Sequence, residues 1–168
     1  MNLSDIKLPR ELEADRADEA IRRVLGARIV QLWPGSELFI PVIAVGDHLK
    51  KVIRRASLNG QVLWGLEAIS AKLNREERGI TNLREDKGLS TGERVSRLLL
   101  LSSDGAERFY RHIERLLQAH APRLFGCMVD MDGSALGDLV TGREKQVKVV
   151  MADHKRVVAE ILRAIAIG

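Results

Sequence analysis

The fold is decided by residues 95–130, which are VSRLLLLSSDGAERFYRHIERLLQAHAPRLFGCMVD. Four consecutive leucines, Leu98–Leu101, predict a strand that is apolar on both faces, as in a buried parallel sheet. The apolar residues that follow recur at helical spacing, and residues 124–130 form a second apolar run. We therefore predict a strand, a helix and a second strand in this order.

The residues after this unit continue the same alternation. Residues 133–141 predict a short helix or loop, residues 146–152 a third strand, and residues 154–165 a closing helix. Strands that alternate with helices favour right-handed crossovers and a mostly parallel sheet. The sequence thus predicts one α/β domain over residues 1–168, a three-layer sandwich whose C-terminal half runs β-α-β-α-β-α.

The N-terminal half is less regular. A helix is predicted over residues 10–25. Two apolar segments, 27–33 and 37–45, flank the turn Pro34-Gly35-Ser36 and could form a hairpin. Two consecutive helices, or one kinked helix, are expected over residues 46–73. Residues 74–94 are polar, glycine-punctuated and without periodicity, which predicts a functional or mobile loop.

Composition sets the broad class. With 45% hydrophobic and 30% charged residues, the 168-residue chain is typical of a globular domain. Cys127 is the single cysteine and lies in an apolar run, so we expect a buried thiol and a reducing, cytoplasmic compartment. The longest apolar stretch, residues 38–45, is too short to span a bilayer, and no membrane partner is expected.

Aspartates follow the predicted strands. Ligands of open α/β sheets bind beyond the carboxyl ends of parallel strands, so these carboxylates are expected to share one edge. Clustered carboxylates suit Mg²⁺, with Asp104, Asp130, Asp132 and Asp153 as candidate metal ligands. The alternative is local: aspartate is a preferred helix N-cap, which accounts for Asp47, Asp104 and Asp153 without any metal.

Two local resemblances concern the segment Met128–Ser134. It resembles the nucleophile motif of haloacid-dehalogenase-like phosphatases, which implies Asp130 as nucleophile and Asp132 as acid/base. The Asp-x-Asp pair is also similar to the metal-binding core of topoisomerase-primase domains, although Ser103 and Asp104 stand where that family has glutamate. Each resemblance covers only a few residues, and neither identifies a family.

Basic residues offer a different site. Lys50, Lys51, Arg54 and Arg55 form two i,i+4 pairs on one predicted helix, and this basic strip could contact phosphates or be a solvated face. Ser103, between a strand and a helix start, is a further ligand-binding candidate. Aromatic residues are 4% of the chain, which leaves little material for stacking nucleic-acid bases.

Three functions follow from these features. The leading hypothesis is a small cytosolic α/β binding or regulatory module, expected to be a homo-oligomer, that recognises an anionic ligand or a nucleic-acid backbone through the basic strip of Lys50, Lys51, Arg54 and Arg55. The second is an Mg²⁺-dependent phosphoryl-transfer or hydrolytic enzyme that uses Asp130 and Asp132, with Lys145 or Lys148 near the phosphate. The third is a scaffold subunit without a small-molecule site.

Overall fold

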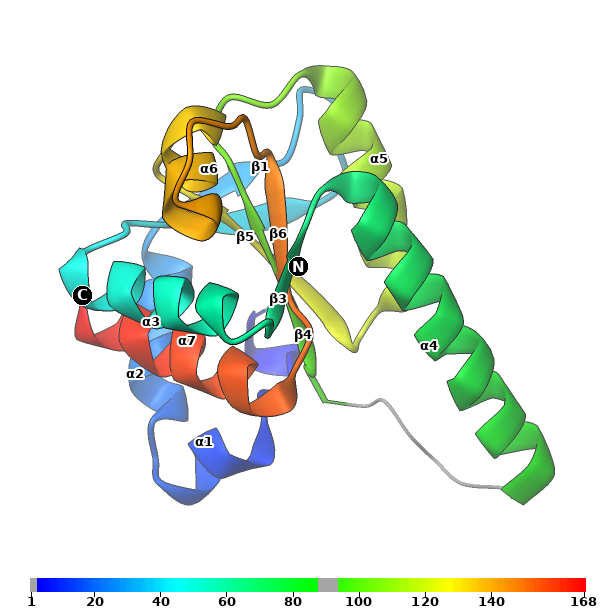
Figure 1. Cartoon of the computed structure of the whole chain (residues 1–168). Coiled ribbons are helices and arrows are strands. Elements are labelled where there is room, and N and C mark those ends of the chain that lie inside the picture. The colour runs from blue at the N-terminus through cyan, green and yellow to red at the C-terminus, as the bar shows by residue number, and fades with distance from the viewer. Residues whose placement is uncertain (1–2, 88–93) are drawn as a thin grey trace.

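A computed structural model of the chain describes residues 3–87 and 94–168, and it confirms the α/β class (Figure 1). The described strands form one mixed sheet of six, in the order β1-β2-β5-β4-β6-β3. Their bounds are β1 Ile29–Gln31, β2 Phe39–Ile43, β3 Val62–Trp64, β4 Arg97–Leu101, β5 Leu124–Val129 and β6 Val149–Ala152.

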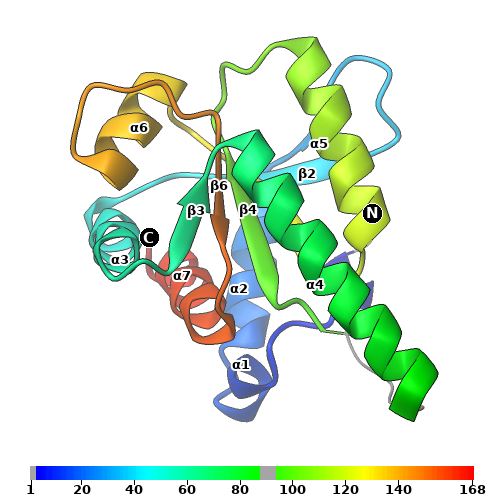
Figure 2. The same ribbon diagram turned by 45° about the vertical axis from the view of Figure 1, so that its right-hand side comes forward.

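Helices cover both faces of the sheet (Figure 2). The described helices are a 3-10 turn at Leu3–Asp5, α1 Arg10–Ala14, α2 Asp18–Ala27, α3 Asp47–Leu58, α4 Leu66–Lys87, α5 Glu107–His120, α6 Gly133–Thr141 and α7 Lys155–Ile167. One hydrophobic cluster lies between the sheet and α2, α3, α6 and α7, and the other lies between the sheet and α4 and α5.

The four leucines of β4 are divided between the two hydrophobic clusters. Leu98 and Leu100 belong to the cluster under α7, whereas Leu99 and Leu101 belong to the cluster under α5. Successive side chains of a strand point to opposite faces, so a strand covered on both sides needs apolar residues at every position. This is the physical basis of the leucine run.

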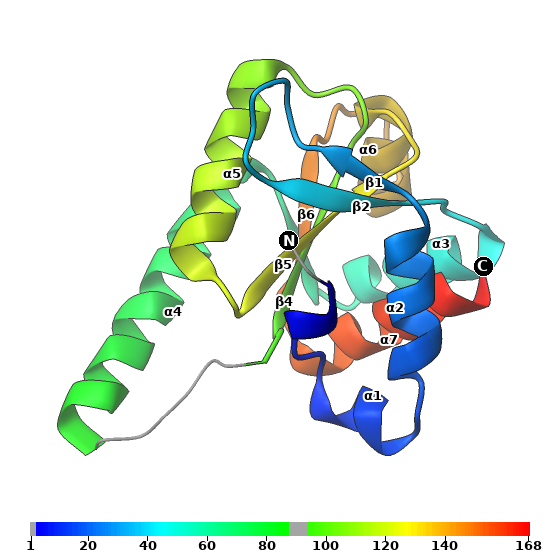
Figure 3. The ribbon, with the colours of Figure 1, turned by 180° about the vertical axis from the view of Figure 1, so that it is seen from behind.

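The sheet is parallel only at its centre. Strands β2, β5 and β4 run in the same direction, whereas β6 is antiparallel to β4, with Leu98 opposite Ala152. The expectation that the third C-terminal strand continues the parallel arrangement is therefore wrong. The first two strands, β1 and β2, pair antiparallel as the predicted hairpin, which lies at one edge of the sheet (Figure 3).

The direction of β6 follows from the segment before it. After α6, residues 142–148 fold back along that helix, and the amide of Val147 donates to the carbonyl of Gly133 at 3.0 Å. A Cβ at Gly137 would lie 1.6 Å from the carbonyl oxygen of Lys145, so glycine permits this close approach. The chain consequently enters β6 at the same end of the sheet at which it left β5. Strand β6 must therefore run antiparallel to β4 and β5.

Three predictions of local structure need correction. The helix expected over residues 10–25 is divided into α1 and α2, with Arg16 between them at a φ of 62°. Residues 62–64 form strand β3 instead of helix, because they pair with β6 at the edge of the sheet. The loop expected over residues 74–94 is helical as far as Lys87, and its residues 88–93 lie outside the described residues.

Cys127 is buried as expected. Its side chain is in the core of β5 with an exposed fraction of 0%, and burial raises the pKa of the thiol to about 12. A thiol with that pKa is protonated at neutral pH and is a poor nucleophile. Among the described residues, no helix is both long and apolar enough to cross a membrane.

Candidate anion-binding site

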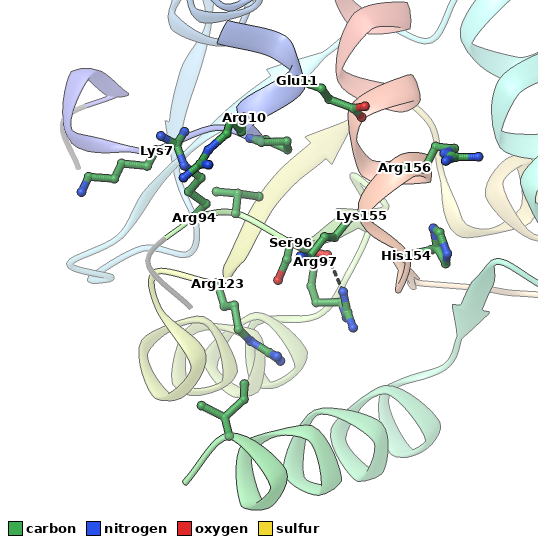
Figure 4. Close-up of a pocket in the computed structure, with 13 residues that line it drawn as sticks. Lys7, Arg10, Glu11, Arg94, Ser96, Arg97, Arg123, His154, Lys155 and Arg156 are labelled. Atoms are coloured by element: carbon green, nitrogen blue, oxygen red, sulfur yellow. Dashed lines mark hydrogen bonds between the residues drawn. The ribbon is translucent and has the colours of Figure 1, made fainter. Parts of the chain in front are cut away.

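A basic cavity of about 890 Å³ lies at one of the two edges of the sheet that are formed by strand ends, namely the edge where β4 and β5 begin. The described residues that line it include one carboxylate, Glu11, and seven cationic side chains: Lys7, Arg10, Arg94, Arg97, Arg123, Lys155 and Arg156. In Figure 4, Lys7, Arg10 and Arg94 lie toward one end of the cavity, and His154 and Arg156 lie toward the other. Four separate segments of the chain therefore bring positive charge to one place.

Two of these cations are held by a carboxylate of α4. Arg97 donates from Nε and Nη2 to both oxygens of Glu76, at 2.9–3.1 Å. Arg123 Nη2 lies 3.4 Å from the same carboxylate. The three side chains are 17%, 10% and 15% exposed for Arg97, Arg123 and Glu76, so one negative charge is shared by two poorly solvated cations.

Arg123 is left with an unused donor. Its Nε is buried and has no hydrogen-bond partner within the described part of the chain. Burial lowers the pKa of Arg123, Glu76 opposes that shift, and the neighbouring Arg97 adds to it. A buried donor without an acceptor costs free energy, most of all on a charged group. An anion in the cavity would supply the second negative charge that the two arginines lack.

The first turn of α7 lies at the same cavity. Its N-cap, His154, makes no side-chain capping bond, and the turn contains Lys155 and Arg156 but no acidic residue. Helix N-termini carry unpaired N–H groups and a partial positive charge, so cations there are unfavourable by about 0.3–1 kcal/mol each. Among the described residues, no carboxylate lies within ion-pair distance of Arg10, Lys155 or Arg156.

The opposite edge of the sheet carries the predicted aspartates. Asp104, Asp130 and Asp132 lie there because β4 and β5 are parallel and both end at that edge. Asp47 also follows a parallel strand, β2, as the first residue of α3. Asp153 follows β6 and therefore lies at the other end of the sheet, near the basic cavity, because β6 is antiparallel.

Asp104 is a structural carboxylate of this edge. Its Oδ1 accepts from the amide of Gly133 at 2.9 Å, and its Oδ2 lies 2.8 Å from Lys148 Nζ. It does not cap α5, which begins at Glu107 after Ala106, so the predicted capping role is wrong. Lys148 reaches Asp104 because β6 begins at the edge where β4 ends.

The other predicted ligands have separate partners. Asp132 caps α6 by accepting from the amide of Ala135 at 2.8 Å, and Asp130 lies 3.8 Å from Arg28. Neither Asp47 nor Asp153 caps a helix, because Gly46 and His154 occupy those positions. Among the side chains that the structure describes, no three of His, Cys, Asp or Glu group as a metal site. The magnesium site stays a prediction.

The Asp104 contacts predict a pH dependence of stability. The Lys148 ammonium, which hydrogen bonds to the carboxylate, lowers the pKa of Asp104 below its usual 3.8, and the Gly133 amide adds to this. A lowered pKa gives stability that is present above the unfolded-state value and is lost as pH falls through the folded-state value. We expect Asp104→Asn to lower Tm near neutral pH, and the gap to the parent to close below about pH 4.

Thermal unfolding of both proteins across this pH range measures the effect. It should be modest, because the Asp104 side chain is 42% exposed and solvent screens the ion pair. Asp138→Asn, on the exposed surface of α6, controls for the loss of one carboxylate. A gap between Asp104→Asn and the parent that stays constant as the pH falls would contradict the role of the charged form.

The remaining sequence candidates lie apart from the cavity. The predicted basic strip lies on α3, and we call it the α3 strip: Lys50, Lys51, Arg54 and Arg55. All four residues are exposed, and Arg55 pairs with Glu160 of α7 at 3.1 Å. Ser103 lies at the acidic edge, where its amide and its hydroxyl both donate to the carbonyl of Met131. The structure therefore brings neither of them to the basic cavity.

Sequence reasoning missed this cavity, although two signals pointed to it. Arg97 and Arg123 each stand at the start of a buried strand, where parallel neighbours bring them to one edge. Lys155 and Arg156 contradict the usual preference for acidic residues in the first turn of a helix. Positions that break a local rule are often functional, and this pair was the clearer signal.

Comparison with known proteins adds little. No protein-family model and no curated protein matches the chain. Several solved structures are similar, among them one described as that of a protein with unknown function from Bacillus halodurans C, with 16% sequence identity and a TM-score of 0.40. The alignment covers 69% of this chain and 96% of that chain. At this identity and TM-score, the likeness carries no argument about function.

Proposed function

We propose that the chain is a binding module for a phosphate-bearing anion, which it holds in the basic cavity. The observation that carries the proposal is Arg123, a poorly solvated cation that shares one carboxylate with Arg97, in a cavity with six further cations. Phosphate oxygens are strong acceptors, and arginine is the side chain best shaped to donate to them.

The α7 N-terminus gives the anion a second contact. The amides of the first turn have no acceptor within the helix, and a phosphate at such a position gains hydrogen bonds and the favourable end of the helix dipole. The same anion relieves the repulsion between that dipole and the side chains of Lys155 and Arg156. Both unfavourable features of the cavity are therefore removed by one kind of ligand.

The residues that line the cavity also indicate which part of a ligand it would recognise. None of the described residues that line it is Phe, Tyr or Trp, so the large aromatic rings on which nucleobases usually stack are absent from it. Recognition then depends on phosphate groups, whether they come from a small molecule or from a nucleic-acid backbone. A volume of about 890 Å³ falls within the range of small-molecule sites.

The test is a titration with inorganic pyrophosphate, followed by calorimetry. The variant Lys155→Ala with Arg156→Ala removes two exposed charges of the cavity, and we expect its affinity to fall about tenfold or more, since charged hydrogen bonds are worth about 1.5–3 kcal/mol. Lys50→Ala with Lys51→Ala removes the same charge from the α3 strip and should change the affinity less than twofold, a bound drawn from surface charges in general.

Either of two results would overturn the proposal. If the parent does not bind pyrophosphate, or binds it as tightly as the cavity variant does, the cavity is not an anion site. If only the α3 variant loses affinity, the anion binds on the α3 strip, as the leading sequence-based hypothesis has it.

A further inference from the structure

A second cavity lies beside the basic one and is apolar. It has a volume of about 310 Å³, and we call it the β2/β5 groove, after the two strands that form its walls. Its lining includes Phe39, Ile40, Leu117, Leu124, Phe125 and Gly126. Only Asp5 and Gln118 among its described residues carry charged or polar side chains.

The groove exists because β2 diverges from β5. The two strands pair at Val42 with Met128 and at Ile43 with Val129, whereas the first residues of β2 pair only with β1. The amino-terminal half of β5 is therefore paired on its β4 side but faces the groove on the other. This opening exposes Phe39, which is 43% accessible although it is a large aromatic side chain.

The two cavities adjoin along three segments of the chain. Val95 lines both of them. In the second segment, Ile6 lines the groove and the next residue, Lys7, lines the basic cavity. In the third, Arg123 lines the basic cavity, and its neighbours Pro122 and Leu124 line the groove. Apolar surface and positive charge thus meet at one boundary, at the edge of the sheet where β4 and β5 begin.

We infer that the ligand is an amphiphile, with a phosphate or diphosphate head group in the basic cavity and a short hydrocarbon tail in the β2/β5 groove. This inference rests on the proposed function, because the head group occupies the site described there. The groove is the size of roughly ten methylene groups, if each takes about the 30 Å³ of a water molecule. The ligand is a free, single-tailed molecule whose tail covers the exposed ring of Phe39.

The experiment measures affinity for a series of n-alkyl phosphates with tails of about four to about ten carbons, each below its micelle concentration. Each methylene that enters the groove should tighten binding by up to about fourfold, until the groove is filled. Pyrophosphate, which has no tail, reports on the head-group site alone. Lys155→Ala with Arg156→Ala should weaken every member of the series by the same factor.

Two variants remove the tail site without touching the cations. Phe39→Ser removes an exposed wall of the groove, and Gln118→Trp fills its mouth from the exposed face of α5. Both should abolish the dependence on tail length and leave pyrophosphate affinity unchanged. The matched control is Ile29→Ser, because Ile29 is 41% exposed on the neighbouring strand β1 and lines neither cavity.

The outcomes separate the two proposals. If pyrophosphate binds but affinity does not rise with tail length, the amphiphile inference is wrong and the anion-binding function stands. If affinity rises equally in Phe39→Ser, Gln118→Trp and the parent, the tail lies outside the groove and the inference is also wrong. If neither pyrophosphate nor any alkyl phosphate binds, the proposed function itself fails.

Discussion

Replacing Glu76 by glutamine should destabilise the protein by about 3 kcal/mol, which corresponds to a fall in Tm of roughly 6–12 °C. The reason is that Glu76 is the one carboxylate among the described residues in contact with both Arg97 and Arg123, which are 17% and 10% exposed. Its loss leaves two poorly solvated cations without their counter-charge, and breaking a buried ion pair costs far more than breaking an exposed one. Denaturant unfolding measures the change.

The same variant should bind pyrophosphate more tightly than the parent. In the parent, Glu76 occupies donors of Arg97 and Arg123 that an anion in the cavity could otherwise use. Because a ligand that binds only the folded state stabilises it, saturating pyrophosphate should recover more of the Tm in the variant than it adds to the parent. This compensation links the buried ion pairs to the proposed site.

The neighbouring Glu77 supplies the control. It lies on the same helix, is 42% exposed, and its nearest basic partner is His120 at 3.6 Å. Glu77→Gln should cost less than about 1 kcal/mol, because solvent screens the Glu77 carboxylate even though its partner, His120, is only 4% exposed. If Glu76→Gln is no more costly than this and leaves pyrophosphate affinity unchanged, the arginines do not depend on Glu76 and do not face the ligand.

Gly137→Ala should destabilise the protein by about 3 kcal/mol, although alanine is normally the better helix former by about 1 kcal/mol. The new Cβ would lie 1.6 Å from the carbonyl oxygen of Lys145 and 2.7 Å from its carbon, so the segment between α6 and β6 must move. That segment directs β6 into the sheet. The free energy of unfolding, measured with denaturant, should therefore fall.

The same substitution in another helix should have the opposite sign. Gly79 lies on an exposed face of α4, and a Cβ built there meets no atom within 4 Å among the described residues. Gly79→Ala should stabilise the protein by about 0.5–1 kcal/mol, because alanine loses less backbone entropy in a helix. Equal effects at the two positions would mean that the contact between α6 and residues 142–148 is not a tight one.

Much of the candidate site could not be predicted, because it depends on which strand ends share an edge. The sequence suggested five aspartates at one edge, and the structure keeps Asp104, Asp130 and Asp132 together but places Asp153 at the far end. Capping was predicted for the wrong residues: Asp104 binds Gly133 and Lys148, whereas Asp132 is the aspartate that caps. Both differences arise from contacts between segments distant in the chain.

The sequence by itself determined where the central strands and their helices lie. A run such as Leu98–Leu101 is a local pattern, and burial on both faces of the sheet is the arrangement that satisfies it. Periodicity also predicted a helix after each of β4 and β6, where α5 and α7 lie, because each of these helices has one apolar face.

Only the tertiary structure decided the direction of β6. An apolar strand has the same pattern whether it runs parallel or antiparallel to its neighbour, and here the choice depends on the contact of Gly137 with Lys145. That reversal places Lys148 beside Asp104 at one edge and brings Lys155 and Arg156 to the cavity of Arg97 and Arg123 at the other. Charges far apart in the chain meet because a strand direction, set by packing, carries them to the same end of the sheet.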